Sequence, residues 1–155
     1  MTAHADSAPR YDALIGLGSN MGDKAANIAR AVALLTEPGD IRLVASSRLY
    51  RTAPWGVTEQ DWFVNAAIAV ATDLAPRELL ARCLGVEETM KRVRHKRWGP
   101  RIIDVDVLAY RDVTIHEPDL TLPHPRIAER AFVLVPLADI APDAKIAGRT
   151  IREWL

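Results

Sequence analysis

Two aspartates, Asp104 and Asp106, alternate within a short apolar segment of the chain. Side chains two residues apart in a β-strand point to the same face, roughly 6.5–7 Å apart, so two carboxylates placed there repel each other. A hard divalent cation relieves that repulsion, and magnesium in ATP sites takes one or two carboxylates together with phosphate oxygens. The alternative is an ordinary solvent-facing strand, and the Asp-x-Asp spacing alone does not separate the two.

The stretch before these aspartates is strongly cationic. Gly99 and Pro100 disfavour continued helix, so we expect a loop that concentrates its charges. Arginine forks match phosphate oxygens. A solvated charge run or a nucleic-acid patch is the alternative, but neither accounts for the acidic pair directly after the cations. A polyphosphate with its metal accounts for both, so the sequence favours an enzyme that uses ATP and magnesium. The basic residues are Lys91, Arg92, Arg94, Lys96, Arg97 and Arg101.

Three further polar or aromatic residues stand out. Glu87 follows Cys83 by one helical turn and lies at the edge of an apolar stripe. We predict a cationic or hydrogen-bonded partner for it, the alternative being a carboxylate that reaches solvent from the edge. Phe63 and Asn65 share one face of a predicted strand, where they could bind the face and the edge of a flat heterocycle. An ordinary polar sheet face explains this pair equally well.

The glycines near the start of the chain do not form a nucleotide-binding motif. Gly16, Gly18 and Gly22 have the wrong spacing for a dinucleotide fingerprint, and residues 41–51 carry no acidic residue for a ribose. The chain also has no Gly-x-x-x-x-Gly-Lys-Ser/Thr sequence, so ATP is not held by a P-loop. The glycines indicate a tight turn between a strand and a helix.

The elements expected to position these residues alternate along the chain. Apolar patterning predicts strands over residues 11–17, 41–51, 62–71 and 101–110. It predicts helices over 24–36, capped by Asp23, and over 76–91, with Leu79, Cys83, Val86 and Met90 buried. After these come a short helical turn beyond Pro125, an apolar run at Phe132–Leu137 and a helix near Thr150–Leu155.

This order is typical of an α+β fold, the ferredoxin-like sandwich, a mainly antiparallel sheet with helices packed on one face. We expect residues 1–10 to form a flexible N-terminus and 11–155 a single domain. Alternation places Phe63 and Asn65 on the face opposite Trp62, Val64, Ala66, Ile68 and Val70. In the last strand it places Ile103, Val105, Val107 and Ala109 together on the core face.

Composition limits the classes of partner. Twenty basic and twenty acidic side chains cancel in the 155 residues, so no global charge attracts nucleic acid or a membrane surface. The only cysteine, Cys83, excludes an internal disulfide framework. Residues 1–10 lack the apolar core of a signal peptide, and no run is long and apolar enough for a membrane helix. We therefore expect a cytoplasmic protein.

Six short motifs follow one another along most of the chain. They are Leu17-Gly18-Ser19-Asn20, Tyr50-Arg51-Thr52-x-Pro54-x-Gly56, Phe63-x-Asn65-Ala66, the block from Arg92-x-Arg94 through Arg97-Trp98-Gly99-Pro100-Arg101 to Asp104-x-Asp106, Leu122-Pro123-His124, and Arg130-x-Phe132. Together they resemble the 6-hydroxymethyl-7,8-dihydropterin pyrophosphokinase family of folate biosynthesis. The block from Arg97 to Leu108 is the most specific of them.

The resemblance implies transfer of the β,γ-diphosphate of ATP to the pterin hydroxymethyl group, with release of AMP. It implies that Asp104 and Asp106 hold two magnesium ions and that Arg92, Arg94 and Arg101 bind phosphates. The implied pterin-binding residues are Thr52, Pro54, Trp55, Phe63, Asn65, Trp98 and Phe132. The implied ATP-binding residues are Glu87, Val107, Thr121, His124 and Arg130, together with the three arginines. A monomer acting only on small molecules is expected.

Three positions depart from the family pattern: Ala53, Lys91 and Pro125. None is a metal ligand. Two other classes of protein were weighed. In a nucleotidyltransferase the acidic pair follows Gly-Ser closely, whereas here Asp104 lies far beyond Ser19. A ferredoxin-like RNA-binding module would need neither aspartate, and the paired aromatic signature of such modules is missing.

Overall fold

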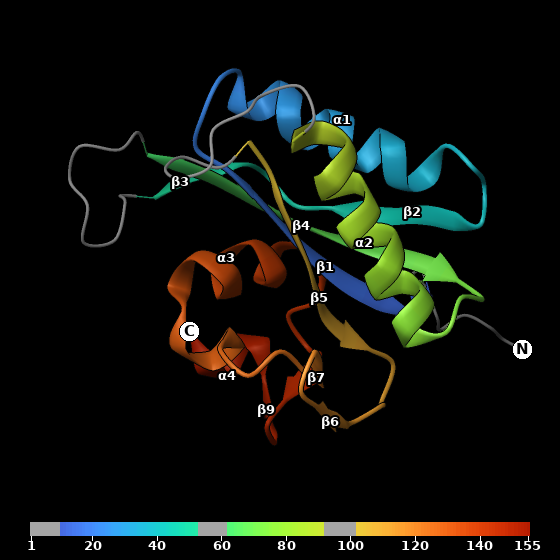
Figure 1. The fold of residues 1–155 in the computed structure, drawn as a ribbon. Helices are drawn as coiled ribbons and strands as arrows, with labels where there is room; N and C mark the ends of the chain where they lie inside the picture. Colours follow the sequence, from blue (N-terminus) through green and yellow to red (C-terminus); the bar gives the residue numbers. More distant parts are fainter. Residues whose placement is uncertain (1–9, 53–61, 92–101) are drawn as a thin grey trace, which may run out of the picture.

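The computed structural model describes residues 10–52, 62–91 and 102–155 (Figure 1). Its main sheet is antiparallel, with strand order β2-β4-β1-β5 and β3 paired to β4. The strands of this sheet are β1 (Ala13–Ser19), β2 (Ile41–Ser46), β3 (Tyr50–Thr52), β4 (Phe63–Thr72) and β5 (Asp104–Tyr110). The ferredoxin-like order predicted from the sequence is confirmed.

Two long helices cover one face of the sheet (Figure 1). In α1 (Lys24–Thr36), the Asp23 side chain accepts a hydrogen bond from the Ala26 N–H at 3.1 Å, as predicted for an N-cap. In α2 (Pro76–Lys91), the four residues of the predicted stripe are the buried ones. These helices and the sheet enclose the larger apolar cluster.

The opposite face of the sheet is also covered, so the expectation of helices on one face alone was wrong. A 3-10 turn (Ile127–Glu129), α3 (Ala131–Ile140) and α4 (Ile151–Trp154) pack there around a second apolar cluster. Ala67 and Ala69 on β4 are small enough for α3 to approach the sheet closely. The hairpin of β8 (Lys145–Ile146) and β9 (Arg149–Thr150) completes this layer. The hairpin of β6 (Ile115–Glu117) and β7 (Leu120–Leu122) packs instead against the larger cluster, in which Leu120 and Leu122 are buried.

Two predicted strands differ in detail from the observed ones. The segment 41–51 is broken into β2 and β3 after Ser46. The Ser47 N–H still donates to the Ala67 carbonyl at 2.8 Å, but the Ala67 N–H donates to the Ser47 hydroxyl at 2.9 Å. A bulge in the β1–β5 ladder lies at Leu108, since Leu14 pairs with Ala109 and Ile15 with Val107. Ala109 therefore faces the second cluster, not the face it was predicted to share with Val107.

No helix within residues 10–52, 62–91 and 102–155 has both the length and the apolar character needed to cross a membrane. The predicted flexible N-terminus at 1–10 lies almost entirely outside the described residues.

Candidate active site

A cavity of about 620 Å³ opens between the sheet and the layer that contains α3. One wall is formed by β3, β4, β5 and the glycine-containing half of β1. The facing wall is formed by the 3-10 turn and the first turn of α3. Seven of the residues selected from the sequence line it: Thr52, Phe63, Asn65, Asp104, Asp106, Arg130 and Phe132.

The sheet wall presents an aromatic ring beside a buried amide. Thr52 pairs with Phe63 across β3 and β4, and the Asn65 side-chain amide donates to the Thr52 hydroxyl at 2.8 Å. Asn65 is only 7% exposed, so the polar atoms that it turns toward the cavity are largely removed from water. Such an amide discriminates between ligands by hydrogen bonding, because an unpaired buried polar group is costly.

The two carboxylates lie next to glycines of the neighbouring strand. Asp104 is paired with Gly18 and Asp106 with Gly16 across β1 and β5. A β-carbon on Gly16 would lie 3.2 Å from Leu108 Cδ1, so that position has little room for a side chain. Both aspartates line the cavity, and the prediction that they share a face is confirmed.

This pair has the donor chemistry of a magnesium site. Both ligands are hard oxygens, and they lie at the open edge strand where phosphate oxygens could join them. Within the described residues, no group of three or more histidine, cysteine, aspartate or glutamate side chains forms a complete metal cage. Two carboxylates fit a magnesium ion that keeps phosphate oxygens and water among its ligands.

Glu87 has the hydrogen-bonded partner that was predicted for it. Its Oε2 accepts from the backbone N–H of Val105 at 2.8 Å, which ties α2 to the edge strand between the two aspartates. Burial raises the pKa of Glu87, the Val105 N–H opposes that rise, and the charges of Asp104 and Asp106 add to it. Glu87 is not among the residues lining the cavity.

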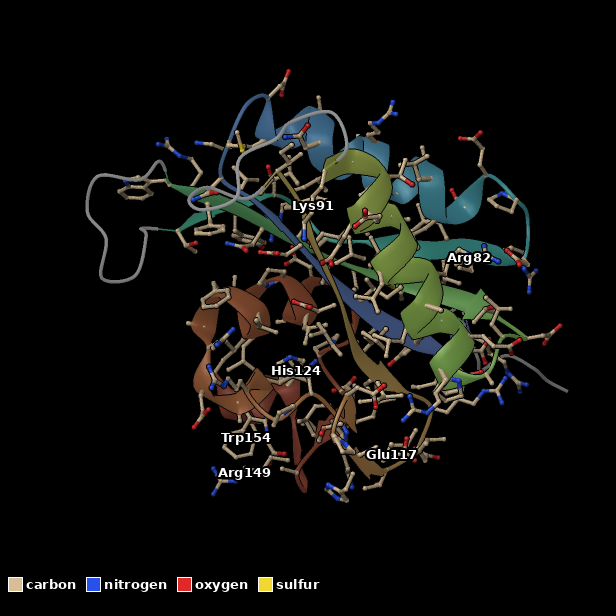
Figure 2. The ribbon with its side chains drawn as sticks, in the orientation of Figure 1. Arg82, Lys91, Glu117, His124, Arg149 and Trp154 are labelled. Atoms are coloured by element: carbon tan, nitrogen blue, oxygen red, sulfur yellow. The ribbon has the colours of Figure 1, made fainter. Side chains whose placement is uncertain are left out.

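His124 lies in the C-terminal layer, below the sheet in the view of Figure 2. Its backbone N–H donates to the Leu108 carbonyl at 2.8 Å, and its Nδ1 accepts from the Arg126 N–H at 3.3 Å. Burial lowers the pKa of His124. The charge of Asp106 partly offsets this decrease, and the charges of Arg130 and Arg126 add to it. The lowered pKa favours the neutral imidazole, and the hydrogen bond accepted by Nδ1 favours the tautomer with its proton on Nε2.

The helix wall brings Arg130 and Phe132 together. The Arg130 guanidinium carbon lies 5.4 Å from the centre of the Phe132 ring, a cation–π distance. Phe132 occupies the first turn of α3, whereas Phe63 belongs to β4. Two aromatic rings on facing walls of one cavity are suited to a flat ligand.

The remaining predicted residues are placed elsewhere. Val107 is buried in the cluster beneath α1 and α2, and Thr121 lies half-buried on β7; neither lines the cavity. Figure 2 labels Lys91 at the end of α2, where the cationic segment begins. Six predicted residues and the cationic loop itself lie outside the described residues: Pro54, Trp55, Arg92, Arg94, Trp98 and Arg101.

Sequence reasoning missed several lining residues. Arg126 and Glu129 line the cavity from the 3-10 turn, and Leu108 and Val133 add apolar surface. Arg126 and Glu129 could have been considered from the sequence, because both are charged and follow His124 closely. Leu108 gave no such signal, because its place depends on the bulge in β5.

Solved structures show the fold class. The crystal structure of wild-type Plasmodium falciparum HPPK-DHPS with pteroate matches with a TM-score of 0.73 at 19% identity, over 93% of this chain and 41% of that chain. A structure of HPPK-DHPS in complex with substrates matches with a TM-score of 0.74 at 16% identity. This chain covers 43% of that second chain, so it spans less than half of either HPPK-DHPS structure.

Sequence similarity shows the family. The chain belongs to the 7,8-dihydro-6-hydroxymethylpterin-pyrophosphokinase (HPPK) family, whose profile matches residues 14–142. It is 57% identical over 143 residues to the 2-amino-4-hydroxy-6-hydroxymethyldihydropteridine pyrophosphokinase of Methylorubrum extorquens, covering 92% of this chain and 90% of that one. The protein of the same name from Bacillus subtilis is 42% identical, with 92% and 89% covered.

Proposed function

We propose that this protein transfers the β,γ-diphosphate of ATP to the hydroxymethyl group of 6-hydroxymethyl-7,8-dihydropterin, as a step of folate biosynthesis. Family membership supports the reaction. The observation that carries the proposal is one cavity in which a carboxylate pair shares the walls with two phenylalanines and a buried amide. The carboxylates suit a metal–polyphosphate, and the rings and amide suit a pterin.

The pterin is assigned to the space between the two phenylalanine rings. Phe63 and Phe132 stack on its faces, and Asn65 with Thr52 hydrogen-bonds its edge. Asn65 supplies both a carbonyl and an amine, which matches the alternating donors and acceptors of a pterin edge. Pro54, Trp55 and Trp98 are proposed to complete this side of the site.

The triphosphate is assigned to the carboxylate side. Asp104 and Asp106 hold two magnesium ions, which neutralise phosphate charge when bound. Arg92, Arg94 and Arg101 are proposed to bind the phosphates bidentately. Arg130 and the Nε2–H of neutral His124 supply further donors, with Glu87, Val107 and Thr121 on the nucleotide side.

The reaction needs positioning more than acid–base chemistry. The pterin hydroxyl oxygen forms a bond to the β-phosphorus, the bond from that phosphorus to the α,β-bridging oxygen breaks, and AMP leaves with the electron pair. The hydroxyl proton is released to solvent. The walls hold the hydroxymethyl group near the triphosphate, and exclusion of water favours transfer over hydrolysis.

The protein is further proposed to act as a cytoplasmic monomer on small molecules, without a nucleic-acid or membrane partner. Equal numbers of acidic and basic side chains support the last part of this proposal, because they give no net charge to attract a polyanionic partner.

The test is to incubate the purified protein with ATP, magnesium and 6-hydroxymethyl-7,8-dihydropterin and to quantify the nucleotides by chromatography. AMP should form in a one-to-one ratio with the pterin consumed. ADP or free pyrophosphate as the main phosphorus product would refute the proposal.

A further inference from the structure

The carboxylate of Asp139, in the last turn of α3, is bound by Tyr50, the first residue of β3, and by Arg48 just before that strand. Its Oδ2 accepts from the Tyr50 hydroxyl at 2.7 Å and from the Arg48 backbone N–H at 3.0 Å. Its Oδ1 accepts from the Arg48 guanidinium at 3.3 Å. These bonds join α3 to the chain at the start of β3, and Asp139 has no part in the reaction described above.

We propose that Asp139 and Tyr50 form a clamp that positions the two walls of the pterin site. Resting on the proposed function, this assigns Asp139 a positioning role mainly for the pterin half of the cavity. On the ATP side only Arg130, which contacts Phe132 from the N-cap of α3, depends on the same helix. The two residues are called the Asp139–Tyr50 clamp below.

On the sheet side, Tyr50 lies next to Thr52 and Asn65, the residues proposed to bind the edge of the pterin. Tyr50 lies two residues before Thr52 in β3, so their side chains share a face of the strand. Tyr50 is paired with Asn65 across β3 and β4, and Asn65 donates to the Thr52 hydroxyl. A shift of Tyr50 therefore moves the amide and hydroxyl that face the cavity.

On the helix side, Asp139 belongs to the same helix as Phe132, the ring proposed to stack on the second face of the pterin. Asp139 follows Phe132 by about two helical turns, so both lie on the same side of α3. Pro136 has no N–H to donate to the Phe132 carbonyl, which weakens the backbone restraint on the first turn. The cavity itself lies against that turn, so the position of Phe132 depends on how the rest of α3 is held.

The stability of α3 itself does not explain why an aspartate occupies position 139. Asp139 lies at the negative end of the helix dipole, where an acidic side chain is unfavourable. Its side chain is 17% exposed, whereas that of Arg48 is 82% exposed, so the guanidinium contributes little. The charge-assisted bond from Tyr50 and the bond from the Arg48 backbone are therefore the polar contacts of Asp139 that add to the apolar packing of α3 on the sheet.

The test compares Asp139→Ala, Asp139→Asn and Tyr50→Phe with the wild-type protein. Asp143→Ala is the matched control, because Asp143 forms an ion pair with Arg152 in which both side chains are more than half exposed. The clamp predicts that Asp139→Ala raises the KM for the pterin about tenfold and the KM for ATP by a clearly smaller factor, through Arg130 alone. Asp139→Asn and Tyr50→Phe should show smaller increases, since each keeps part of the bonding, and Asp143→Ala none.

A double variant separates positioning from general damage. Tyr50→Phe should add nothing to Asp139→Ala, because both remove the same bond. Equal rises in KM for both substrates, or a pterin KM equal to that of the wild type, would overturn the clamp.

Hydrogen exchange provides a second readout that does not need turnover. Amides of residues 131–135 should exchange faster in Asp139→Ala and Tyr50→Phe than in the wild type or Asp143→Ala. Unchanged exchange in both variants would also refute the clamp. Failure of the proposed function would appear separately, as a wild-type protein that forms no AMP from ATP and the pterin.

Discussion

A β-carbon placed on Gly18 would lie 3.0 Å from the side-chain oxygen of Asn65. That contact is tighter than nearly all real ones, so Asn65 would have to shift by a few tenths of an ångström, and its hydrogen bond to Thr52 opposes that shift. Glycine at position 18 therefore lets the amide of the neighbouring strand face the cavity without that shift.

Replacing Gly18 by alanine should displace the Asn65 amide and weaken pterin binding by about tenfold, through loss of its hydrogen bonds. Isothermal calorimetry with the pterin would measure the change. Gly85→Ala is the matched control, because a β-carbon on Gly85 meets no atom within 4 Å. It should leave binding intact and raise the free energy of unfolding by about 0.5–1 kcal/mol, since alanine is the better helix former. Normal pterin affinity in Gly18→Ala would count against the role given to Asn65.

Asp104→Asn and Asp106→Asn should each reduce turnover by about 100-fold or more, because each removes a metal ligand. The stability of the folded protein should not decrease, since the change relieves repulsion between two carboxylates. Thermal unfolding without ligand should show a Tm equal to or slightly above that of the wild type. Asp112→Asn, an exposed aspartate beyond β5, serves as the control. Unfolding of the variants, or near-normal turnover, would contradict the assignment.

Phe63→Ala and Phe132→Ala should raise the Kd for the pterin by roughly tenfold or more while leaving the Kd for an ATP analogue nearly unchanged, because stacking serves only the flat ring. Calorimetric titrations with each ligand would check this. Trp62→Ala is a matched aromatic control: Trp62 precedes Phe63, is 47% exposed and does not line the cavity. Equal loss of both ligands would show that the two phenylalanines act as core residues instead.

The free energy of unfolding should fall as the pH drops below about 4. The Thr72 N–H lowers the pKa of Asp12, burial opposes this, and the Arg111 guanidinium reinforces it. A carboxyl whose folded pKa is lowered stabilises the fold above its unfolded pKa, and this contribution is lost as the pH falls through the folded value.

Asp12→Asn tests that origin, because it removes the charge and can keep the Thr72 bond. The variant should be less stable than the wild type at pH 7, and the gap should close as the pH falls toward 2 in urea titrations. A gap that stays constant over this range would exclude Asp12 as a source of the acid sensitivity.

The features that could be predicted from the sequence were those in which apolar and polar residues repeat with the period of a helix or a strand. The buried stripe of α2 follows the helical repeat, and the shared face of Phe63 and Asn65 follows strand alternation, so both appear as expected. Asp104 and Asp106 meet in the cavity for the same reason.

The features that were missed depend on tertiary packing. The run at 132–137 is apolar on every side and gives no period, so it could not show that α3 covers the second face of the sheet. The bulge at Leu108 reverses the direction of Ala109 without any turn residue to mark it. The Arg126 and Glu129 side chains reach the cavity only because the layer that contains the 3-10 turn and α3 packs over the sheet.

The central claim is that the pterin oxygen attacks the β-phosphorus of ATP. The most direct measurement uses 6-hydroxymethyl-7,8-dihydropterin labelled with oxygen-18 in its hydroxymethyl group and analyses the products by phosphorus NMR and mass spectrometry. The account predicts that all of the label is retained in a pterin diphosphate, as the oxygen between carbon and phosphorus, with unlabelled AMP as the other product. A pterin monophosphate accompanied by ADP, or unmodified labelled pterin accompanied by free pyrophosphate, would contradict it.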